Sequence, residues 1–281
     1  METLTLNIRG RLVDLSTPKV MGIVNVTPDS FYPGSRTSGR EALERRILQL
    51  REEGADIVDL GGYSSRPGAD DVSPEEEYSR LASGLEVVKE VWPEVPVSID
   101  TFRASVARRC VEEWGADIIN DIGGGTLDPE MWQTVADLRV AYVLMHMRGT
   151  PSTMSSLTDY EDVTAEVITD LSRKVYELRG LGVCDIIIDP GFGFAKTVDQ
   201  NFRLLDELRE FCRMGMPVLA GMSRKTMIWK TLGVTPEESL TGTISLNTIA
   251  LREGATILRV HDVKAAREVV MLHEAMKRAC R

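Results

Sequence analysis

The chain has 281 residues, of which 43% are hydrophobic and 27% are charged, a composition typical of a globular protein with a sizeable core. This length suits one α/β barrel, which takes roughly 250 residues, so we expect a single domain over residues 1–281. A net charge of -10 argues against a nucleic-acid partner, and any anionic ligand would have to be held locally.

The cysteines and the apolar runs indicate a cytoplasmic protein with no membrane partner. The four cysteines, at positions 110, 184, 212 and 280, lie far apart, which suits reduced thiols better than a disulfide framework or a zinc site. The N-terminus lacks the apolar core of a signal peptide. Apolar runs such as residues 141–145 are too short to span a bilayer.

In chain order, residues 4–15 (LTLNIRGRLVDL) predict a short N-terminal β-hairpin, and apolar runs then alternate with stretches of helical period. We expect strands within residues 20–26, 55–62, 96–100, 116–121, 141–146, 185–191, 216–221 and 255–262. Helices are expected at 39–54, 73–92, 102–115 and 159–180, among others. Eight such units predict a (β/α)8 TIM barrel with a short N-terminal β-hairpin, and a doubly wound open sheet is the alternative.

Long loops rich in Gly, Ser, Pro and Thr follow the first, second and fifth predicted strands. Loops of this length often close over a ligand site, so we expect lids here. The first of them lies within MGIVNVTPDSFYPGSR, residues 21–36, where a buried strand ends in a cluster of polar side chains.

Polar side chains end or follow nearly every predicted strand. They are Asn25, Asp59, Asp100, Asn120, Asp121, His146, Asp189, Ser223, Arg224, Lys225, Arg259, His261 and Asp262. A turn or a helix cap would explain any single case, but not the whole series. Because ligands bind at the carboxyl ends of barrel strands, the series predicts a site at that rim.

The acidic part of the series points to a flat ligand with N–H donors. Asp100, Asn120 and Asp189 offer acceptors, and a carboxylate there would bind two neighbouring N–H groups, as on a 2-amino-pyrimidinone edge. Lys225 would donate to a ring carbonyl. Met145 or Phe194 would pack on a ring face.

A cationic group lies opposite in the predicted site. It contains Arg66, Arg259 and His261, and the hydroxyls of Ser64 and Ser65 stand beside it in the sequence. These side chains suit phosphate oxygens.

Asn25 and Asp29 offer hard oxygen ligands for Mg²⁺, which usually keeps several waters and bridges substrate phosphates.

His146 suits a structural role and a ligand contact equally, whereas His273 suits helix packing. The glycines at 123–125 lack the spacing of a dinucleotide fingerprint and indicate a turn. We find no Ser-His-Asp or Cys-His arrangement in the sequence.

Eight segments carry a family resemblance, in order along nearly the whole chain. They are MGIVNVTPDSF, DIVDLGGYSSRPGA, SIDTFR, ADIINDIGG, LMHMRGTP with IIIDPGFGFAKT, GMSRK and LRVHDV. With them the chain resembles the dihydropteroate synthase family of pterin-binding barrels. The resemblance implies condensation of 6-hydroxymethyl-7,8-dihydropterin pyrophosphate with p-aminobenzoate, giving 7,8-dihydropteroate and pyrophosphate in folate biosynthesis.

The resemblance also implies residue roles. Pterin would be held by Asp100, Asn120, Met145, Asp189, Gly221 and Lys225, with Arg259 stacked on it. Pyrophosphate would contact Asn25, Arg66, Arg259 and His261, with Asn25 also reaching Mg²⁺, and p-aminobenzoate would contact Ser65, Pro67, Phe194, Ser223 and Lys225. Asp100, Lys225, Arg259 and His261 would serve the reaction itself. The same resemblance implies a homodimer and a p-aminobenzoate pocket that admits sulfonamides.

The chain departs from the family pattern at three places. Tyr63 stands where the family usually has Glu, Ser65 stands where it usually has Thr, and FYPG at 31–34 is bulkier than usual. A non-catalytic pterin-binding paralogue is one alternative, and Tyr63 is its only support. A methyltetrahydrofolate-type pterin methyltransferase is another, but it should lack NVTPDSF, SSRPG and SRK.

Overall fold

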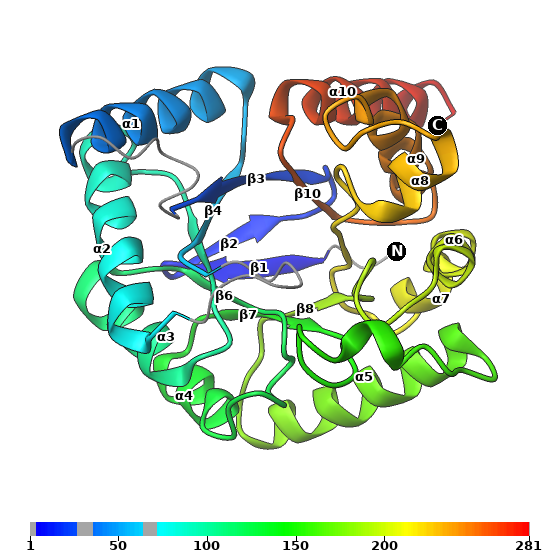
Figure 1. Cartoon of the computed structure of the whole chain (residues 1–281), viewed down its shortest axis with the longest axis horizontal. Helices are drawn as coiled ribbons and strands as arrows, with labels where there is room; N and C mark the ends of the chain where they lie inside the picture. The colour runs from blue at the N-terminus through cyan, green and yellow to red at the C-terminus, as the bar shows by residue number, and fades with distance from the viewer. Residues whose placement is uncertain (1–3, 27–35, 64–71, 281) are drawn as a thin grey trace.

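Eight parallel strands form a barrel at the centre of the molecule (Figure 1). The computed structural model describes residues 4–26, 36–63 and 72–280. The strand order is β8-β7-β6-β5-β4-β3-β10-β9, and a parallel bridge between Ile188 and Val218 joins the two ends. The strands are β3 (Lys19–Asn25), β4 (Ile57–Gly61), β5 (Val97–Asp100), β6 (Ile118–Asp121), β7 (Ala141–Met145), β8 (Ile186–Asp189), β9 (Leu219–Ala220) and β10 (Ile257–Val260). The predicted barrel is therefore confirmed, and the open-sheet alternative is wrong.

Helices surround the barrel as an outer ring (Figure 1). They are α1 (Arg36–Glu53), α2 (Pro74–Val91), α3 (Ala104–Trp114), α4 (Met131–Leu138), α5 (Val163–Gly180), α6 (Val198–Asp206), α7 (Leu208–Cys212), α8 (Thr226–Leu232), α9 (Leu240–Arg252) and α10 (Val263–Ala279), with a 3-10 turn η2 (Met154–Ser156). Side-chain caps begin several of them, such as Ser73 before α2 and Thr197 before α6. Among the described helices, none is long and apolar enough to cross a membrane.

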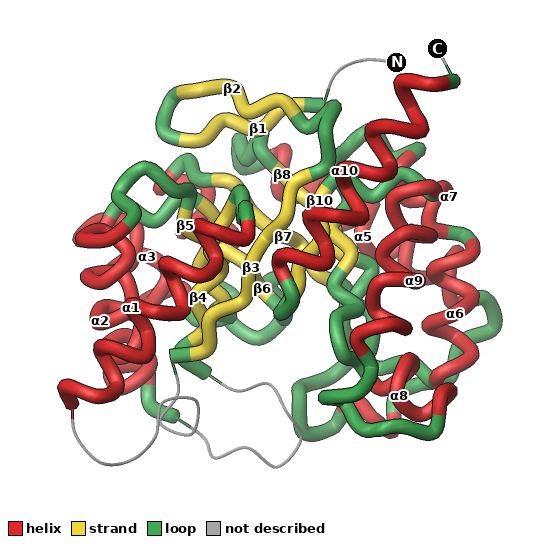
Figure 2. Tube along the Cα trace, turned by 90° about the horizontal axis from the view of Figure 1, so that it is seen from above, coloured by secondary structure: helices red, strands yellow, loops and turns green. Residues whose placement is uncertain are grey.

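The predicted hairpin forms and closes the end of the barrel where the strands begin (Figure 2). It consists of β1 (Thr5–Ile8) and β2 (Arg11–Asp14), paired antiparallel. Leu6, Ile8 and Leu15 are buried against the first inward-facing residues of the barrel strands, including Met21 and Ile57. The hairpin therefore completes the core at this end and leaves the opposite rim as the place for a site.

The barrel strands are apolar because both of their faces are buried. One cluster of side chains fills the space between strands and helices, and it includes Leu60, Ile99 and Ile119. A second cluster fills the barrel interior near the hairpin. A third lies at the rim and contains Ile122, Met145, Met147, Met154 and Ala195.

Strand register places the rim residues side by side. Asn25 pairs with Gly61, Gly61 with Asp100, and Asp100 with Asn120, so these residues form one row across four strands. Since side chains alternate between the two faces of a strand, members of such a row point the same way. Gly61 contributes no side chain and leaves room between Asn25 and Asp100.

Of the predicted lids, the one after β7 is described and includes η2, where Met154 joins the rim cluster. The first two predicted lids fall largely on residues 27–35 and 64–71, which lie outside the described residues.

Candidate active site

The centre of the rim is an ion cluster formed by Arg259 and two carboxylates. Arg259 donates from Nε to Oδ2 of Asp59 over 2.7 Å, and from Nη2 to Oδ2 of Asp100 over 2.5 Å. Burial alone would lower the pKa of Arg259, but the two carboxylates outweigh it and raise the pKa above its ordinary value. Arg259 is therefore a permanent cation in the barrel mouth.

Asp100 is a carboxyl group whose ionised form is disfavoured by its surroundings. Burial raises its pKa to about 7, although Arg259 opposes the shift, and Asp59 adds to it by repulsion. A group with such a pKa is poised to accept hydrogen bonds or to offset positive charge near neutral pH.

Asp59 organises the cluster from below. Its side chain is fully buried, and its carboxylate also lies 3.4 Å from the Nδ2 of Asn120, which donates to it. One carboxylate therefore orients both the cation and the amide of the site. The sequence pointed to Asp59 only as a strand-end residue and assigned it no role, because a strand-end aspartate does not reveal which partners it meets.

Asp189 and Lys225 lie on the other side of the mouth, beside Gly221. A β-carbon placed on Gly221 would lie 3.9 Å from Oδ2 of Asp189 and 3.9 Å from Nζ of Lys225. Burial raises the pKa of Asp189, while burial lowers the pKa of Lys225 to about 8. The two side chains therefore lie close to the Gly221 position, and each favours the charged form of the other.

The loop after β8 surrounds Lys225. Its Nζ donates to the carbonyl oxygen of Phe192, and it lies 4.7 Å from the centre of the Phe194 ring. Phe194 packs against the rim cluster that contains Met145. This side of the mouth therefore joins an apolar surface to a cationic donor.

His261 and Ser223 form a hydrogen-bonded pair at the lip. The backbone N–H of His261 donates to Oγ of Ser223, and this oxygen lies 3.0 Å from Nδ1 of the same imidazole. The hydroxyl can donate its own proton to Nδ1, and in that arrangement the imidazole proton lies on Nε2. Burial lowers the pKa of His261 to about 4, so the imidazole is neutral near pH 7. The sequence grouped His261 with the cations of the site, and in this arrangement burial and the neighbouring Arg259 lower the pKa of its ring.

Asn25 ends β3 at the same level. A β-carbon on Gly61 would lie 3.6 Å from Oδ1 of Asn25 and 3.9 Å from Oδ2 of Asp100, so two hard oxygens flank this point. No group of three or more His, Cys, Asp or Glu side chains that could hold a metal occurs among the described residues. This donor set suits an Mg²⁺ ion that takes most of its ligands from water and phosphate.

Comparisons with known proteins show the family of the chain. The pterin binding enzyme family matches residues 21–261. Dihydropteroate synthase of Synechocystis is 42% identical over 92% of this chain and 90% of its own length. The chain belongs to the dihydropteroate synthase family.

Solved structures of the family share the fold. Dihydropteroate synthase of Xanthomonas albilineans with 4-aminobenzoic acid has a TM-score of 0.89 and 40% identity, over 98% of this chain and 99% of that one. The Yersinia pestis enzyme in a sulfonamide complex has a TM-score of 0.90 and 35% identity, over 98% of this chain and 100% of that one. The chain is an enzyme that transfers a pterinylmethyl group in folate biosynthesis.

Against this family background, several predicted rim residues have local structural partners. Asp121 accepts from the backbone N–H groups of Gly123 and Gly125 and from the Tyr142 hydroxyl, so it shapes the glycine turn. Arg224 and Asp262 form a two-pronged ion pair. His146, whose role was open, is buried beside Lys196 with its pKa lowered to about 2, chiefly by burial.

The structure does not place every predicted site residue. Ser65, Arg66 and Pro67 lie outside the described residues, as do Asp29 and the FYPG segment. Tyr63 is described, and its ring meets the Phe102 ring edge-on at 5.2 Å between centres. The guanidinium of Arg103 lies 5.4 Å from the Tyr63 ring centre. The family's usual Glu is thus replaced here by a member of an aromatic and cationic stack.

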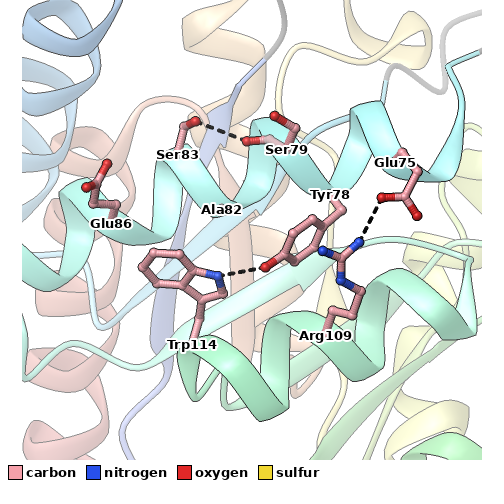
Figure 3. A pocket seen from close by; sticks show the side chains of 8 residues that line it. All are labelled: Glu75, Tyr78, Ser79, Ala82, Ser83, Glu86, Arg109 and Trp114. Atoms are coloured by element: carbon pink, nitrogen blue, oxygen red, sulfur yellow. Dashed lines mark hydrogen bonds and ion pairs between the residues drawn. The ribbon is translucent and has the colours of Figure 1, made fainter.

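A separate cavity of about 480 Å³ lies between α2 and α3, on the outer side of the barrel (Figure 3). Trp114 donates to the Tyr78 hydroxyl over 3.1 Å, and Arg109 pairs with Glu75 over 2.9 Å. These contacts join the two helices, so we assign the cavity to helix packing rather than to the reaction.

Proposed function

We propose that the rim residues described above carry out the family reaction in this chain, with the whole of residues 1–281 forming one pterin-binding barrel domain. The pterin lies over the barrel mouth. Asp100, Asn120 and Asp189 accept its ring N–H groups, Lys225 donates to its carbonyl, and Met145 and Gly221 line its faces. One observation supports the pterin site most strongly. Asp100 and Asn120 lie in one row, and Asp189 and Lys225 lie together on the other side of the mouth.

The pyrophosphate group lies at the lip of the mouth. Arg259 provides a permanent positive charge, and His261 provides its Nε2 proton. Asn25 ends β3, the strand that pairs with β10. Arg66 belongs to this group by the family pattern. A preorganised cation and donors stabilise the charge that builds on the leaving pyrophosphate.

Mg²⁺ is the cofactor that fits this site, with Asn25 as its protein ligand and the substrate phosphates and water as the others. When bound, it would add positive charge beside the leaving group.

The p-aminobenzoate lies on the Phe194 side. Lys225 and Ser223 offer donors and Phe194 offers a ring face, while Ser65 and Pro67 complete the pocket by the family pattern. Ser65 keeps the hydroxyl of the usual Thr and loses its methyl group. The same pocket admits sulfonamides, which imitate this substrate.

The reaction is a substitution at the methylene carbon of the pterin. The C–O bond to pyrophosphate breaks, the neutral amine of p-aminobenzoate forms the new C–N bond, and the amine then loses a proton. An aromatic amine is already nucleophilic at pH 7, so no general base is needed for its attack. Asp100 offsets positive charge on the pterin ring as the C–O bond breaks, which favours a dissociative path.

Two further properties belong to the proposal. The described cysteines are free, which suits the reducing cytoplasm.

A homodimer would cover exposed apolar side chains of α10, where Met271 is 63% and Leu272 is 72% exposed. Analytical ultracentrifugation tests the dimer, and a monomer at micromolar concentration would contradict it.

The experiment that tests the proposed function is a turnover assay. Purified chain is mixed with the pterin pyrophosphate, p-aminobenzoate and Mg²⁺, and both released pyrophosphate and 7,8-dihydropteroate are measured. We expect equal amounts of both, and a strong fall when a chelator removes the metal. Pterin binding without either product would identify the non-catalytic paralogue, and transfer of a methyl group from methyltetrahydrofolate would identify the methyltransferase.

A further inference from the structure

Lys196 is a buried lysine on the loop between β8 and α6, outside the site residues assigned above. Its side chain is 9% exposed, and its Nζ meets three acceptors. They are the carbonyl oxygen of Gly191 at 3.0 Å, the carbonyl oxygen of Phe194 at 2.9 Å and Nδ1 of His146 at 3.0 Å. An ammonium group has three N–H bonds, so every donor of Lys196 has a partner.

The loop that Lys196 spans has a backbone that needs support. Gly191, Gly193 and Ala195 all have positive φ, at 74°, 82° and 50°. A left-handed conformation at a residue other than glycine costs about 1 kcal/mol or more, so the surrounding contacts must hold Ala195 there. Lys196 ties the start of this loop to its end and, through His146, to the neighbouring strand β7.

The same loop encloses the side chain of Lys225. Phe192 supplies the carbonyl oxygen that accepts from Lys225, and the Phe194 ring lies beside its Nζ. A β-carbon on Gly193 would lie only 3.1 Å from Cδ of Lys225. The position of the Lys225 ammonium therefore depends on the shape of this loop.

We infer that Lys196 is a positioning residue for the condensation: by bracing residues 191–194 against β7, it holds Lys225 and Phe194 in place on the p-aminobenzoate side. This inference rests on the proposed roles of Lys225 and Phe194. The brace does not touch Asp100 or Asn120, which come from β5 and β6. Of the other proposed pterin contacts, Asp189 accepts from the Gly191 N–H and Lys225 donates to Phe192, so the braced loop reaches part of the pterin site as well. Loss of the brace should therefore change the KM for p-aminobenzoate more than the KM for the pterin pyrophosphate.

The surroundings of Lys196 disfavour its charged form, so its ammonium group depends on the three acceptors that hold it. Burial lowers its pKa to about 7, and Asp189 opposes the shift, while Lys225, Arg148 and Lys174 add to it. Because His146 accepts at Nδ1, its proton lies on Nε2 when Lys196 is charged. A buried ammonium with three satisfied donors fixes geometry more strictly than an apolar side chain of the same length.

The test compares Lys196→Met with Lys264→Met, a control at an exposed position on α10. Steady-state kinetics are measured for each substrate well below the thermal midpoint of each variant. For Lys196→Met we expect kcat to fall about tenfold to a hundredfold, as for the loss of hydrogen bonds to a charged group. The KM for p-aminobenzoate should rise at least about fivefold and the KM for the pterin pyrophosphate by less, because Lys225 serves both substrates in the proposed site whereas Phe194 serves only p-aminobenzoate; a purely structural lesion would not separate the two values.

His146→Phe is a second variant, which keeps a ring but removes one acceptor of the brace. It should show the same separation of KM values to a smaller extent. Turnover within twofold of the wild type in both variants, or an equal rise in both KM values, would overturn the inference.

A double-mutant cycle with Lys225→Met separates this inference from the proposed function. If Lys196 acts through Lys225, adding Lys196→Met to Lys225→Met should lower kcat by less than about threefold. Full additivity would refute the positioning role. Normal turnover of Lys225→Met alone would instead refute the proposed role of Lys225.

Discussion

Arg259 and Asp59 lie 200 positions apart in the chain, yet Nε of the first donates to Oδ2 of the second over 2.7 Å. The pair sits where β10 and β4 flank β3, and it holds the guanidinium between two carboxylates. Because Asp59 is fully buried, this contact is not weakened by solvent in the way surface ion pairs are.

The first prediction concerns Asp59. Asp59→Asn keeps the shape of the side chain but removes the charge that orients Arg259, so kcat/KM should fall by roughly 10- to 150-fold, the equivalent of about 1.5–3 kcal/mol. Asp56→Asn is the matched control, because Asp56 pairs with Arg267 at the opposite end of the same strand. Equal turnover in the two variants would contradict the orienting role.

The second prediction concerns Asp189 and Lys225. Lys225→Ala and Asp189→Ala should each lower pyrophosphate release by about 10²–10³-fold, the usual effect of losing one preorganised polar group. Far-ultraviolet circular dichroism should stay unchanged. Lys230→Ala, on the exposed side of α8, serves as the control. Near-normal turnover in either site variant would count heavily against the assignment.

The third prediction concerns pH. In the free enzyme the pKa of Asp100 is raised to about 7, so the carboxylate that accepts the ring N–H groups is lost as pH falls below that value. The kcat/KM for the pterin pyrophosphate, which reports the free enzyme, should therefore drop on the acid side of pH 7. Asp100→Asn cannot titrate, so its residual activity should lack this acid limb. An unchanged limb in that variant would assign the titration to the substrate.

The fourth prediction concerns the stack around Tyr63. Tyr63→Ala removes an edge-to-face pair with Phe102 and a ring under Arg103, so the free energy of unfolding should fall by about 1–2 kcal/mol. Urea denaturation measures the change. Tyr176→Ala is the control, since Tyr176 is 81% exposed, and its effect should stay within about 0.5 kcal/mol. If both variants unfold alike, the stack contributes nothing to stability.

Much of the architecture follows from local pattern. Apolar runs bounded by turn residues located all eight barrel strands, because parallel strands covered on both faces must be apolar throughout. The hairpin was also predicted, from the β-rich run at residues 4–15, and in the structure its turn places Arg9 and Gly10 at positive φ. Polar residues at the strand ends then indicated a site at one rim.

The sequence by itself determined the barrel and the set of polar groups at its strand ends, because strand period and strand-end chemistry are local properties of the chain. The family followed from the resemblance of its motifs. Only the tertiary structure decided which of those groups face one another. It placed Asp59 under Arg259, turned Asp121 toward its own loop and left His261 neutral. It also placed Nζ of Lys196 against the carbonyl oxygens of Gly191 and Phe194. Partner choice and pKa depend on burial and on contacts between distant strands, which no local pattern encodes.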